Sequence, residues 1–471
     1  MTSPRLTLPP GPRSPAAVQL SHWLRRPFAF MDACAARFGD TFTVRFAGFG
    51  TLVFFSNPED LRAIFTGDPD LLHSGEANSA LSDILGRHSV LTLDGAEHLR
   101  QRKLLLPPFQ GERMQAYAAV MRDATLRAID AWPVGEPFAL HPFMQSITLE
   151  VILKAVFGVD EGAGKSRLTA ALARLLATIG SPYSLLIPAV LSAFGRTARD
   201  WATRKLTRET DEALYAEIAA RRAASGGPER HDILSMLLRA RHEDGQPMSD
   251  HELRDELMTL LVAGHETTAT ALAWTFQLVL AHPEVRAKIE AELEAAGVAP
   301  PIDAARLAHL DGLDAAVKES LRLRPILPIV VRLTKGPVTI NGRTFPAGVR
   351  LAPCIYLTQR RPELYPDPEV FRPERFAGKK PDPYGWIPFG GGIRRCIGIS
   401  FALLEMRVVV ASVLASVRLR LAPGPGPVVR RRGITLAPST GTLVVNEGRR
   451  ATQAPSPTPG SRSSSAARTS P

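Results

Sequence analysis

Cysteine is scarce in this chain, which has three in 471 residues: Cys34, Cys354 and Cys396. Cysteines so few and so widely spaced do not form a disulfide framework, and they favour a reducing compartment. Because only one of them lies in a motif suited to chemistry, neither a zinc site nor an iron–sulfur cluster fits the sequence.

Long apolar runs and linkers are missing as well. Residues 1–15 are polar and proline-rich, so they predict neither a signal peptide nor a membrane anchor. The apolar run 181–195 is too short to span a bilayer; it predicts either a lid or a surface that touches a membrane. We expect an extended lead-in over 1–19, a single unit over 20–447 and a disordered Ser/Pro/Arg-rich tail over 448–471.

Acidic residues are fewer than basic ones, 46 against 57, which gives a formal net charge of +11. The sequence shows no basic stripe interleaved with aromatic residues and no nucleic-acid motif, so nucleic acid is not the expected partner. A basic patch for an acidic protein partner is the better interpretation. Four arginines of the C-terminal stretch, Arg449, Arg450, Arg462 and Arg468, account for part of the excess.

The patterns that are present predict one large, mostly helical unit with a few strands. Ser249 and Glu252 form a capping box at the start of a long central helix that ends near Ala281. Helices are also expected over 27–38, from 58 to 64, through most of 111–225, and after Cys396. Alternating residues predict a hairpin over 41–55, and Asn341-Gly342 predicts another hairpin turn.

Cys396 lies in the stretch FGGGIRRCIG, residues 389–398. A lone cysteine is most often an inert buried residue. Here, however, four glycines allow close approach or left-handed backbone, and Arg394, Arg395 and the start of a following helix favour the thiolate. A single thiolate in such a loop suits heme iron.

Four motifs, in this order, resemble those of the cytochrome P450 family. They are HxxxR at His98, AGHETT at 263–268, ExxR at Glu319 and FxxGxRxCxG at Phe389. The resemblance covers roughly residues 20–446 and is closest to the soluble bacterial type. It implies a mainly α fold with a small β region, arranged as a triangular helical domain with a β-rich lobe, and heme b (protoheme IX) with Cys396 as the axial thiolate ligand.

The resemblance also assigns residues that bind the cofactor. His98 and Arg102, four residues apart and therefore on one helical face, match a pair that bonds the heme propionates. The alternative for this pair is a solvated basic helix end. Arg332 occupies a second propionate-binding position, and Phe389 and Arg394 belong to the signature around Cys396.

The AGHETT stretch predicts the catalytic pair Glu266 and Thr267. Thr267 can bond back to the Ala263 carbonyl, and a glutamate and threonines at the centre of a buried helix are costly unless they are used. The alternatives are a surface carboxylate and an ordinary buried threonine. In the family such a pair holds water and delivers protons to oxygen.

Glu319 and Arg322 share a helical face, and Arg375 matches the third member of a buried Glu–Arg–Arg network. An exposed ion pair of little consequence is the alternative. We assign these three residues to folding and to support of the heme loop.

The function implied is a cytoplasmic monooxygenase that inserts one oxygen atom from O2 into a hydrophobic small molecule, fatty acid or terpenoid-like. Electrons would come from an external ferredoxin or flavodoxin with an NAD(P)H reductase, and no membrane anchor is expected. In the family, residues 74–90 form a loop over the substrate pocket, and an ordinary surface loop is the alternative for them; Ile329 and Val330 are expected to form part of the pocket wall. The alternatives are a peroxide-driven peroxygenase or isomerase, and a noncatalytic heme-binding protein.

Overall fold

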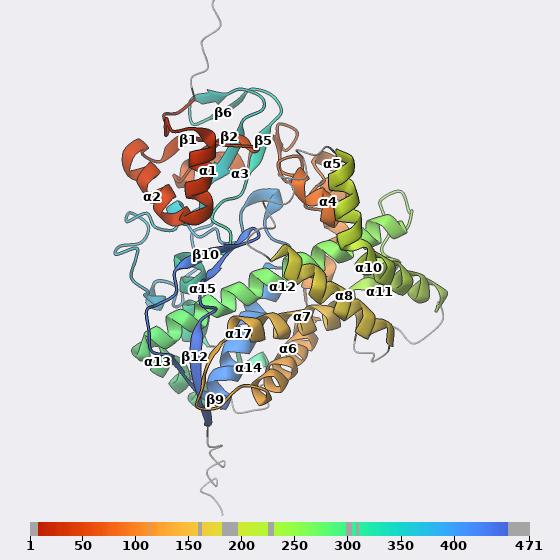
Figure 1. Cartoon of the computed structure of the whole chain (residues 1–471), viewed down its shortest axis with the longest axis vertical. Coiled ribbons are helices and arrows are strands. Elements are labelled where there is room, and N and C mark those ends of the chain that lie inside the picture. Colours follow the sequence, from red (N-terminus) through yellow and green to blue (C-terminus); the bar gives the residue numbers. More distant parts are fainter. Residues whose placement is uncertain are drawn as a thin grey trace, which may run out of the picture.

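A computed structural model describes residues 8–111, 113–158, 163–180, 196–224, 230–297, 304–307 and 310–450. The predicted lid at 181–195 and the tail from residue 451 lie outside the described residues. Helices form most of the chain and strands a smaller part, as expected (Figure 1). The helices are α1 (Ala16–Arg25), α2 (Pro27–Phe38), α3 (Pro58–Phe65), α4 (Ser82–Leu85), α5 (Gly95–Leu105), α6 (Arg113–Asp130), α7 (His141–Phe157), α8 (Ala163–Ile179), α10 (Arg196–Ala223), α11 (Ile233–Arg239), α12 (Asp250–Ala281), α13 (Pro283–Ala295), α14 (Ala304–Leu307), α15 (Asp311–Leu323), α16 (Ile355–Thr358) and α17 (Ile399–Ser416).

The β-rich lobe is built on a sheet with strand order β1-β2-β8-β5-β3, beside α1, α2 and α3 (Figure 1). Its strands are β1 (Thr41–Phe46), β2 (Gly50–Phe55), β3 (Leu72–His73), β5 (Arg332–Thr334) and β8 (Arg350–Pro353). The predicted hairpin is confirmed, since β1 and β2 pair antiparallel from Thr41 to Phe55. A second hairpin joins β6 (Val338–Ile340) to β7 (Arg343–Phe345) through Asn341 and Gly342, whose positive φ angles of 45° and 81° suit a type I′ turn.

The central helix α12 organises the helical domain. Its N-terminus is the predicted capping box, in which the Ser249 side chain accepts from the Glu252 amide and the Glu252 carboxylate accepts from the Ser249 amide. At 1.5 Å per residue its 32 residues extend about 48 Å. Most of its side chains are buried, so α12 crosses the interior of the domain.

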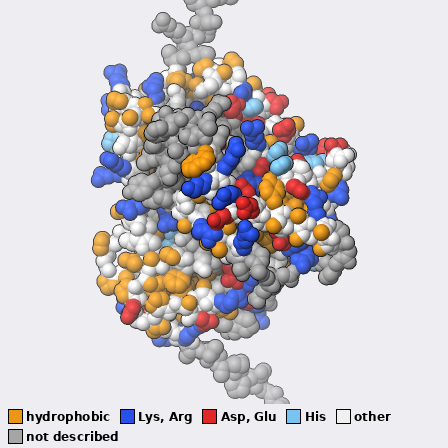
Figure 2. All heavy atoms as spheres, turned by 45° about the vertical axis from the view of Figure 1, so that its right-hand side comes forward, with side chains coloured by type: hydrophobic (Ala, Val, Ile, Leu, Met, Phe, Trp, Pro, Cys, Tyr) orange, Lys and Arg blue, Asp and Glu red, His pale blue; other side chains and the backbone are white. Residues whose placement is uncertain are grey.

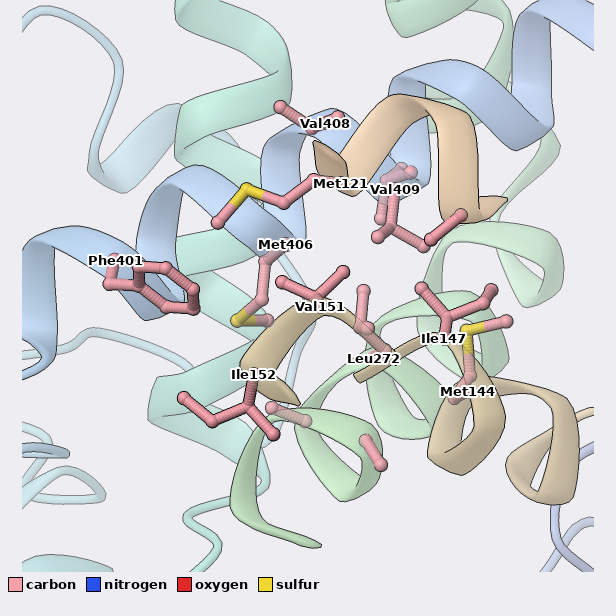
Figure 3. Packing of buried hydrophobic residues seen from close by; sticks show 14 of the residues in the cluster. Met121, Met144, Ile147, Val151, Ile152, Leu272, Phe401, Met406, Val408 and Val409 are labelled. Carbon is pink, nitrogen blue, oxygen red and sulfur yellow. The ribbon is translucent and has the colours of Figure 1, made fainter. Parts of the chain in front are cut away.

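The main core forms where α12 meets α6, α7 and α17. Figure 3 shows Ile147 and Val151 of α7 facing Leu272 of α12, with Met406 and Val409 of α17 on the opposite side. All five are buried. Helix α17 is long and apolar enough to cross a membrane by length and composition, but it packs within this core, as the core helix of a globular domain does.

Strands near the C-terminus return to the helical domain. Strand β12 (Leu443–Arg449) pairs with β4 (Pro137–Ala139) and β9 (Val417–Leu421), while β10 (Val429–Arg432) pairs with β11 (Thr435–Pro438). The β10–β11 ribbon lies between the β-rich lobe and the helices (Figure 1). It is fixed there because the Leu436 amide donates to the Ile326 carbonyl and the Trp274 indole to the Leu436 carbonyl.

Ordered structure extends past the expected domain limits at both ends. Helix α1 begins at Ala16, and the Gln19 amide group bonds the carbonyls of Pro12 and Ser14. Strand β12 runs to Arg449, two residues beyond the expected limit at 447. On the face drawn in Figure 2, basic and acidic side chains are interspersed, so the net positive charge is not concentrated there.

Candidate active site

The loop that carries Cys396 is held by its own backbone. The Cys396 amide donates to the Phe389 carbonyl at 3.0 Å, and the Phe389 ring packs edge-on against Trp386. Gly390 and Gly392 have φ angles of 68° and 63°, a left-handed conformation that favours glycine. These bonds and turns fix the sulfur in place before α17 begins.

Two of the loop glycines are required by a neighbouring helix. A Cβ atom added at Gly391 would lie 2.4 Å from the Phe65 ring, and one at Gly392 would lie 2.0 Å from the Phe65 carbonyl oxygen. These glycines therefore let the loop pack on the end of α3. A Cβ atom added at Gly398 would meet nothing within 4 Å, so that side of the loop borders open space.

The electrostatic surroundings of Cys396 differ from the expected ones. Its side chain is accessible, yet protein surrounds it closely enough for burial to raise the pKa of the thiol, against the lowering effect of the Gly398 amide, Arg102 and Arg395. Arg394 does not contribute, because its guanidinium bonds Asp94 at 2.5 Å and the carbonyls of Val90 and Leu93. The expectation that Arg394 promotes the thiolate is therefore corrected.

Basic side chains from three elements gather beside this loop. His98 and Arg102 come from α5, Arg332 from β5, and Arg394 from the Cys396 loop. Arg102 donates to the Arg395 carbonyl at 2.7 Å, which ties α5 to the loop. Burial, followed by the charges of Arg394, Arg102 and Arg332, lowers the pKa of His98 to about 3.

This basic cluster, His98, Arg102, Arg332 and Arg394, is short of negative charge. Burial and the charge of Arg394 lower the pKa of Arg332 to about 10, and the Asp94 carboxylate opposes this. Asp94 also accepts from Arg394, but the buried Nδ1 atom of His98 has no hydrogen-bond partner among the described residues. An anionic group with several acceptor atoms would satisfy the cluster, so the residues present fit the propionates of heme.

The middle of α12 has accessible surface. Ala263 is exposed and Thr267 half-buried, although the helix is buried on both sides of them. The Thr267 hydroxyl donates to the Ala263 carbonyl at 2.7 Å, as predicted. A Cβ atom added at Gly264 would lie 3.2 Å from Ile152, so this glycine serves the packing of α12 on α7.

Glu266 is held by residues that sequence reasoning missed. Its Oε2 atom accepts from the Gln145 amide at 2.6 Å, and its Oε1 atom lies 3.3 Å from Nε of Arg432. Thr270 and the buried His141 also face Oε1, at 3.4 and 3.8 Å. The carboxylate is thus oriented by α7 and by the β10–β11 ribbon, elements far from it in sequence.

The predicted Glu–Arg–Arg network is present behind the loop. Arg322 and Glu319 are fully buried and share two hydrogen bonds of 2.7 and 2.9 Å, and Arg375 lies 3.3 Å from Glu319. Arg322 also bonds the carbonyls of Gln359 and Pro368, and the Gln359 side chain accepts from the Ile387 amide. The network therefore supports the chain that leads into Phe389.

The end of segment 74–90, which is expected to lie over the pocket, is hydrogen-bonded to α12. Asp255 accepts from the His88 amide at 3.0 Å, and the buried Glu256 accepts from the Val90 amide at 2.8 Å. Burial raises the pKa of Glu256 well above its usual range. Together with Asp94, these acidic residues position the segment beside the basic cluster, and no local pattern identifies them.

The fold, the accessible cysteine and the basic cluster define a heme-thiolate protein, and comparison with known proteins agrees. The family model of cytochrome P450 matches residues 9–445, so the chain belongs to the cytochrome P450 family. Members of this family are monooxygenases that contain heme b bound through a thiolate.

Mycobacterial proteins and solved structures are similar over most of the chain. Cytochrome P450 135B1 of Mycobacterium tuberculosis is 40% identical over 93% of this chain and 91% of its own, and cytochrome P450 137 is 37% identical over 87% and 83%. The structure of retinoic acid-bound cyanobacterial CYP120A1 has 27% identity and a TM-score of 0.79, over 94% of this chain and 99% of that chain.

Proposed function

We propose that the Cys396 thiolate would hold the heme iron and that the basic cluster would hold the propionates. The observation that carries this proposal is an accessible cysteine beside buried cations that lack counter-charge. The heme supplies the binding and activation of O2. The protein orients the substrate, excludes water and delivers protons.

Glu266 and Thr267 deliver those protons in this proposal. The half-buried Thr267 hydroxyl lies beside the exposed Ala263 and hydrogen-bonds its carbonyl, so it is positioned to hold a water molecule. Glu266 lies next to it in sequence, and its ion-pair partner Arg432 is about a third exposed. A carboxylate that can turn between such a partner and an internal water can carry protons from solvent.

The substrate in this proposal is a hydrophobic small molecule, fatty acid or terpenoid-like. Ile329 and Val330 follow α15 and flank the β-rich lobe, where both pack against its apolar clusters. The similar cyanobacterial structure holds retinoic acid, a hydrophobic isoprenoid. Hydroxylation or epoxidation are the reactions that this chemistry allows.

The protein takes electrons from a separate ferredoxin or flavodoxin with an NAD(P)H reductase, and we place it in the cytoplasm. Arg395 and Arg100 are exposed on or beside the elements that hold Cys396, where an acidic partner would dock. Such docking predicts that reduction of the heme slows as salt rises above about 0.1 M.

Substitution of Cys396 by serine tests the ligand assignment. Replacing a thiolate by an alcohol should abolish the red-shifted absorption of the reduced, carbon monoxide-bound protein. Cys354→Ser is the matched control, because Cys354 is buried in the β-rich lobe and should leave that band in place. If Cys396→Ser kept the band, the assignment would be wrong.

Turnover with a surrogate ferredoxin system distinguishes the alternatives. A monooxygenase consumes NADPH and forms product, and a peroxygenase forms product from hydrogen peroxide alone. A noncatalytic heme-binding protein does neither. The Glu266–Thr267 pair favours the first outcome.

A further inference from the structure

Glu266 makes one hydrogen bond that is much shorter than its other side-chain contacts. The Gln145 side chain of α7 donates from Nε2 to Oε2 of Glu266 at 2.6 Å. Arg432, Thr270 and His141 all face the other oxygen, Oε1, at 3.3, 3.4 and 3.8 Å. Among the described residues, Gln145 is therefore the one side chain that binds Oε2.

Helix α7 holds Gln145 in a fixed place beside α12. Two residues after Gln145, Ile147 is buried in the main core (Figure 3). The buried Thr148 hydroxyl lies 2.9 Å from Nδ1 of His265, the residue that precedes Glu266. Polar contacts thus join α7 to two consecutive residues of α12, which fixes the Gln145 amide beside the carboxylate.

The carboxylate that Gln145 holds is not directed at Thr267. Successive side chains on a helix diverge by about 100° because a turn contains 3.6 residues. The Thr267 hydroxyl donates to the Ala263 carbonyl, while the Glu266 oxygens contact side chains of α7 and β10. Glu266 therefore has to turn before it can pass a proton toward Thr267, and its hydrogen bond with Gln145 has to break.

Protonation of Glu266 weakens this hydrogen bond. A hydrogen bond to an ionised carboxylate is roughly twice as strong as a hydrogen bond between neutral groups. Arg432, whose side chain is 35% exposed, likewise attracts the ionised form. Uptake of a proton from the solvent side therefore loosens both contacts at once and leaves the carboxyl group free to turn.

We infer that Gln145 is a positioning residue for proton delivery, whose amide holds the ionised Glu266 carboxylate beside Arg432 and releases it when it is protonated. The proton passes from solvent to Glu266 and then to the water beside Thr267, so that Glu266 returns in its ionised form to Gln145. The inference rests on the proposed function and adds a residue to the same proton path.

Gln145→Met tests this role in the heme-loaded protein, because it keeps the length of the side chain and removes the donor. Turnover with a surrogate ferredoxin system, with dodecanoic acid and with retinoic acid as probes, gives the hydrogen peroxide formed per NADPH consumed. This ratio should rise about threefold, a small part of the 10²–10⁴-fold contribution of an acid–base group. Exchange of H2O for D2O should raise the ratio more in the variant than in the wild type. The dissociation constants of the probes, read from the spin-state change, should not change.

Thr148→Val is the matched control on α7. It removes a buried hydroxyl that contacts His265, so the peroxide ratio should keep its wild-type value even if the protein is less stable. A Glu266→Gln background provides a second control. There Gln145→Met should have no further effect on the ratio, because the carboxylate that Gln145 positions is absent.

The heme-free proteins test the contact without turnover. The shift in melting temperature caused by Gln145→Met should be smaller in the Glu266→Gln background than in the wild type, as expected for two residues that share a hydrogen bond. A residue that only fills space beside α12 would give the same shift in both backgrounds.

The possible results separate the two proposals. An unchanged peroxide ratio in Gln145→Met, an equal rise in Thr148→Val, or equal shifts in melting temperature in the two backgrounds would overturn the role of Gln145. In each of these cases a thiolate-type carbon monoxide spectrum would leave the proposed function standing, whereas a wild type without that spectrum would overturn both. A rise that occurs in Gln145→Met and disappears in the Glu266→Gln background supports the inference.

Discussion

Two groups of buried basic residues lie near the Cys396 loop, and they differ in how much of their positive charge carboxylates offset. Arg322 and Arg375 share the buried carboxylate of Glu319, and Arg322 also bonds backbone carbonyls. The basic cluster at His98 and Arg332 has more positive charge than its carboxylate, Asp94, can offset. A group whose positive charge is offset by carboxylates stabilises the folded chain itself. A group with excess positive charge contributes free energy to the binding of an anion instead.

Removal of the Glu319 carboxylate from its pairs with Arg322 and Arg375 should have the largest effect on stability. Glu319→Ala leaves Arg322 buried without a counter-charge, which should cost about 3–5 kcal/mol of the free energy of unfolding. Denaturant titration of the heme-free and heme-loaded proteins measures this. Glu369→Gln, whose partner is Arg360 but whose side chain is 68% exposed, should cost less than about 1 kcal/mol. Similar costs for the two variants would contradict the comparison.

Substitution in the basic cluster, where positive charge exceeds negative charge, should have the opposite effect on stability. Arg332→Met should leave the heme-free protein as stable as the wild type, or more so, because it removes like-charge repulsion and burial of a cation. Heme affinity should fall about 10- to 100-fold, as expected for a lost charged hydrogen bond. Arg375→Met is the matched control, since it is similarly buried but paired with Glu319.

Transfer of heme to apomyoglobin measures the affinity of each variant. Arg375→Met should destabilise the heme-free protein more than Arg332→Met and weaken heme binding less. If Arg332→Met destabilised the heme-free protein as much as Arg375→Met does, Arg332 would be part of the scaffold.

Lowering the pH should reduce the stability of the heme-free protein through His98, a member of the basic cluster. The pKa of His98 is lowered from 6.5 to about 3 in the folded protein, so the unfolded chain takes up the proton first as pH falls. The stabilising contribution is complete above pH 6.5 and is lost as pH falls toward 3. At pH 5 the heme-free protein should have lost about 2 kcal/mol through this residue.

Comparison of the wild type with His98→Gln isolates this contribution. Unfolding at pH 7.5 and at pH 5.0 should show a smaller loss in the variant, by about 2 kcal/mol. The buried His141 and His265, whose pKa values are lowered to about 3 and about 4, remain in both proteins and cancel. Heme should reduce the difference, because nearby propionates would favour protonated His98. Equal pH dependence in the two heme-free proteins would exclude His98 from the cluster.

Local patterns predicted much of the fold and the signature residues. The capping box at Ser249, the turn at Asn341-Gly342 and the Glu319–Arg322 pair each involve residues within four positions, so sequence spacing determines their geometry. The fold class was predicted through the resemblance to the family, and the family model confirms it.

Pairings between distant residues were not predictable. Asp94 meets Arg394 across 300 positions, and Gln145 meets Glu266 across 121. Such contacts depend on how whole elements pack, and a single sequence carries no periodicity that reports it. For the same reason the partner of Arg394 and the role of Gly391 beside Phe65 were missed.

The smallest expected effect concerns Thr267, and a second threonine on α12 sharpens it. Thr267 and Thr275 both donate to the carbonyl four residues earlier, at 2.7 and 2.9 Å. Thr267 is half-buried in the accessible middle of α12, whereas Thr275 is fully buried in the core. Removal of the fully buried Thr275 hydroxyl should leave the larger packing defect, so a loss of coupling that is confined to Thr267 points to proton delivery and not to packing.

Thr267→Ala should still bind heme, O2 and substrate, because none of these requires the hydroxyl. Without it, the protein would deliver protons less effectively, so NADPH consumption would continue while hydrogen peroxide replaced product. General acid–base groups contribute about 10²–10⁴-fold, but water substitutes in part, so we expect the ratio of product to NADPH to fall about tenfold. Thr275→Ala should keep the wild-type ratio. If Thr267→Ala kept it too, Thr267 would have no part in proton delivery and the peroxygenase alternative would gain support.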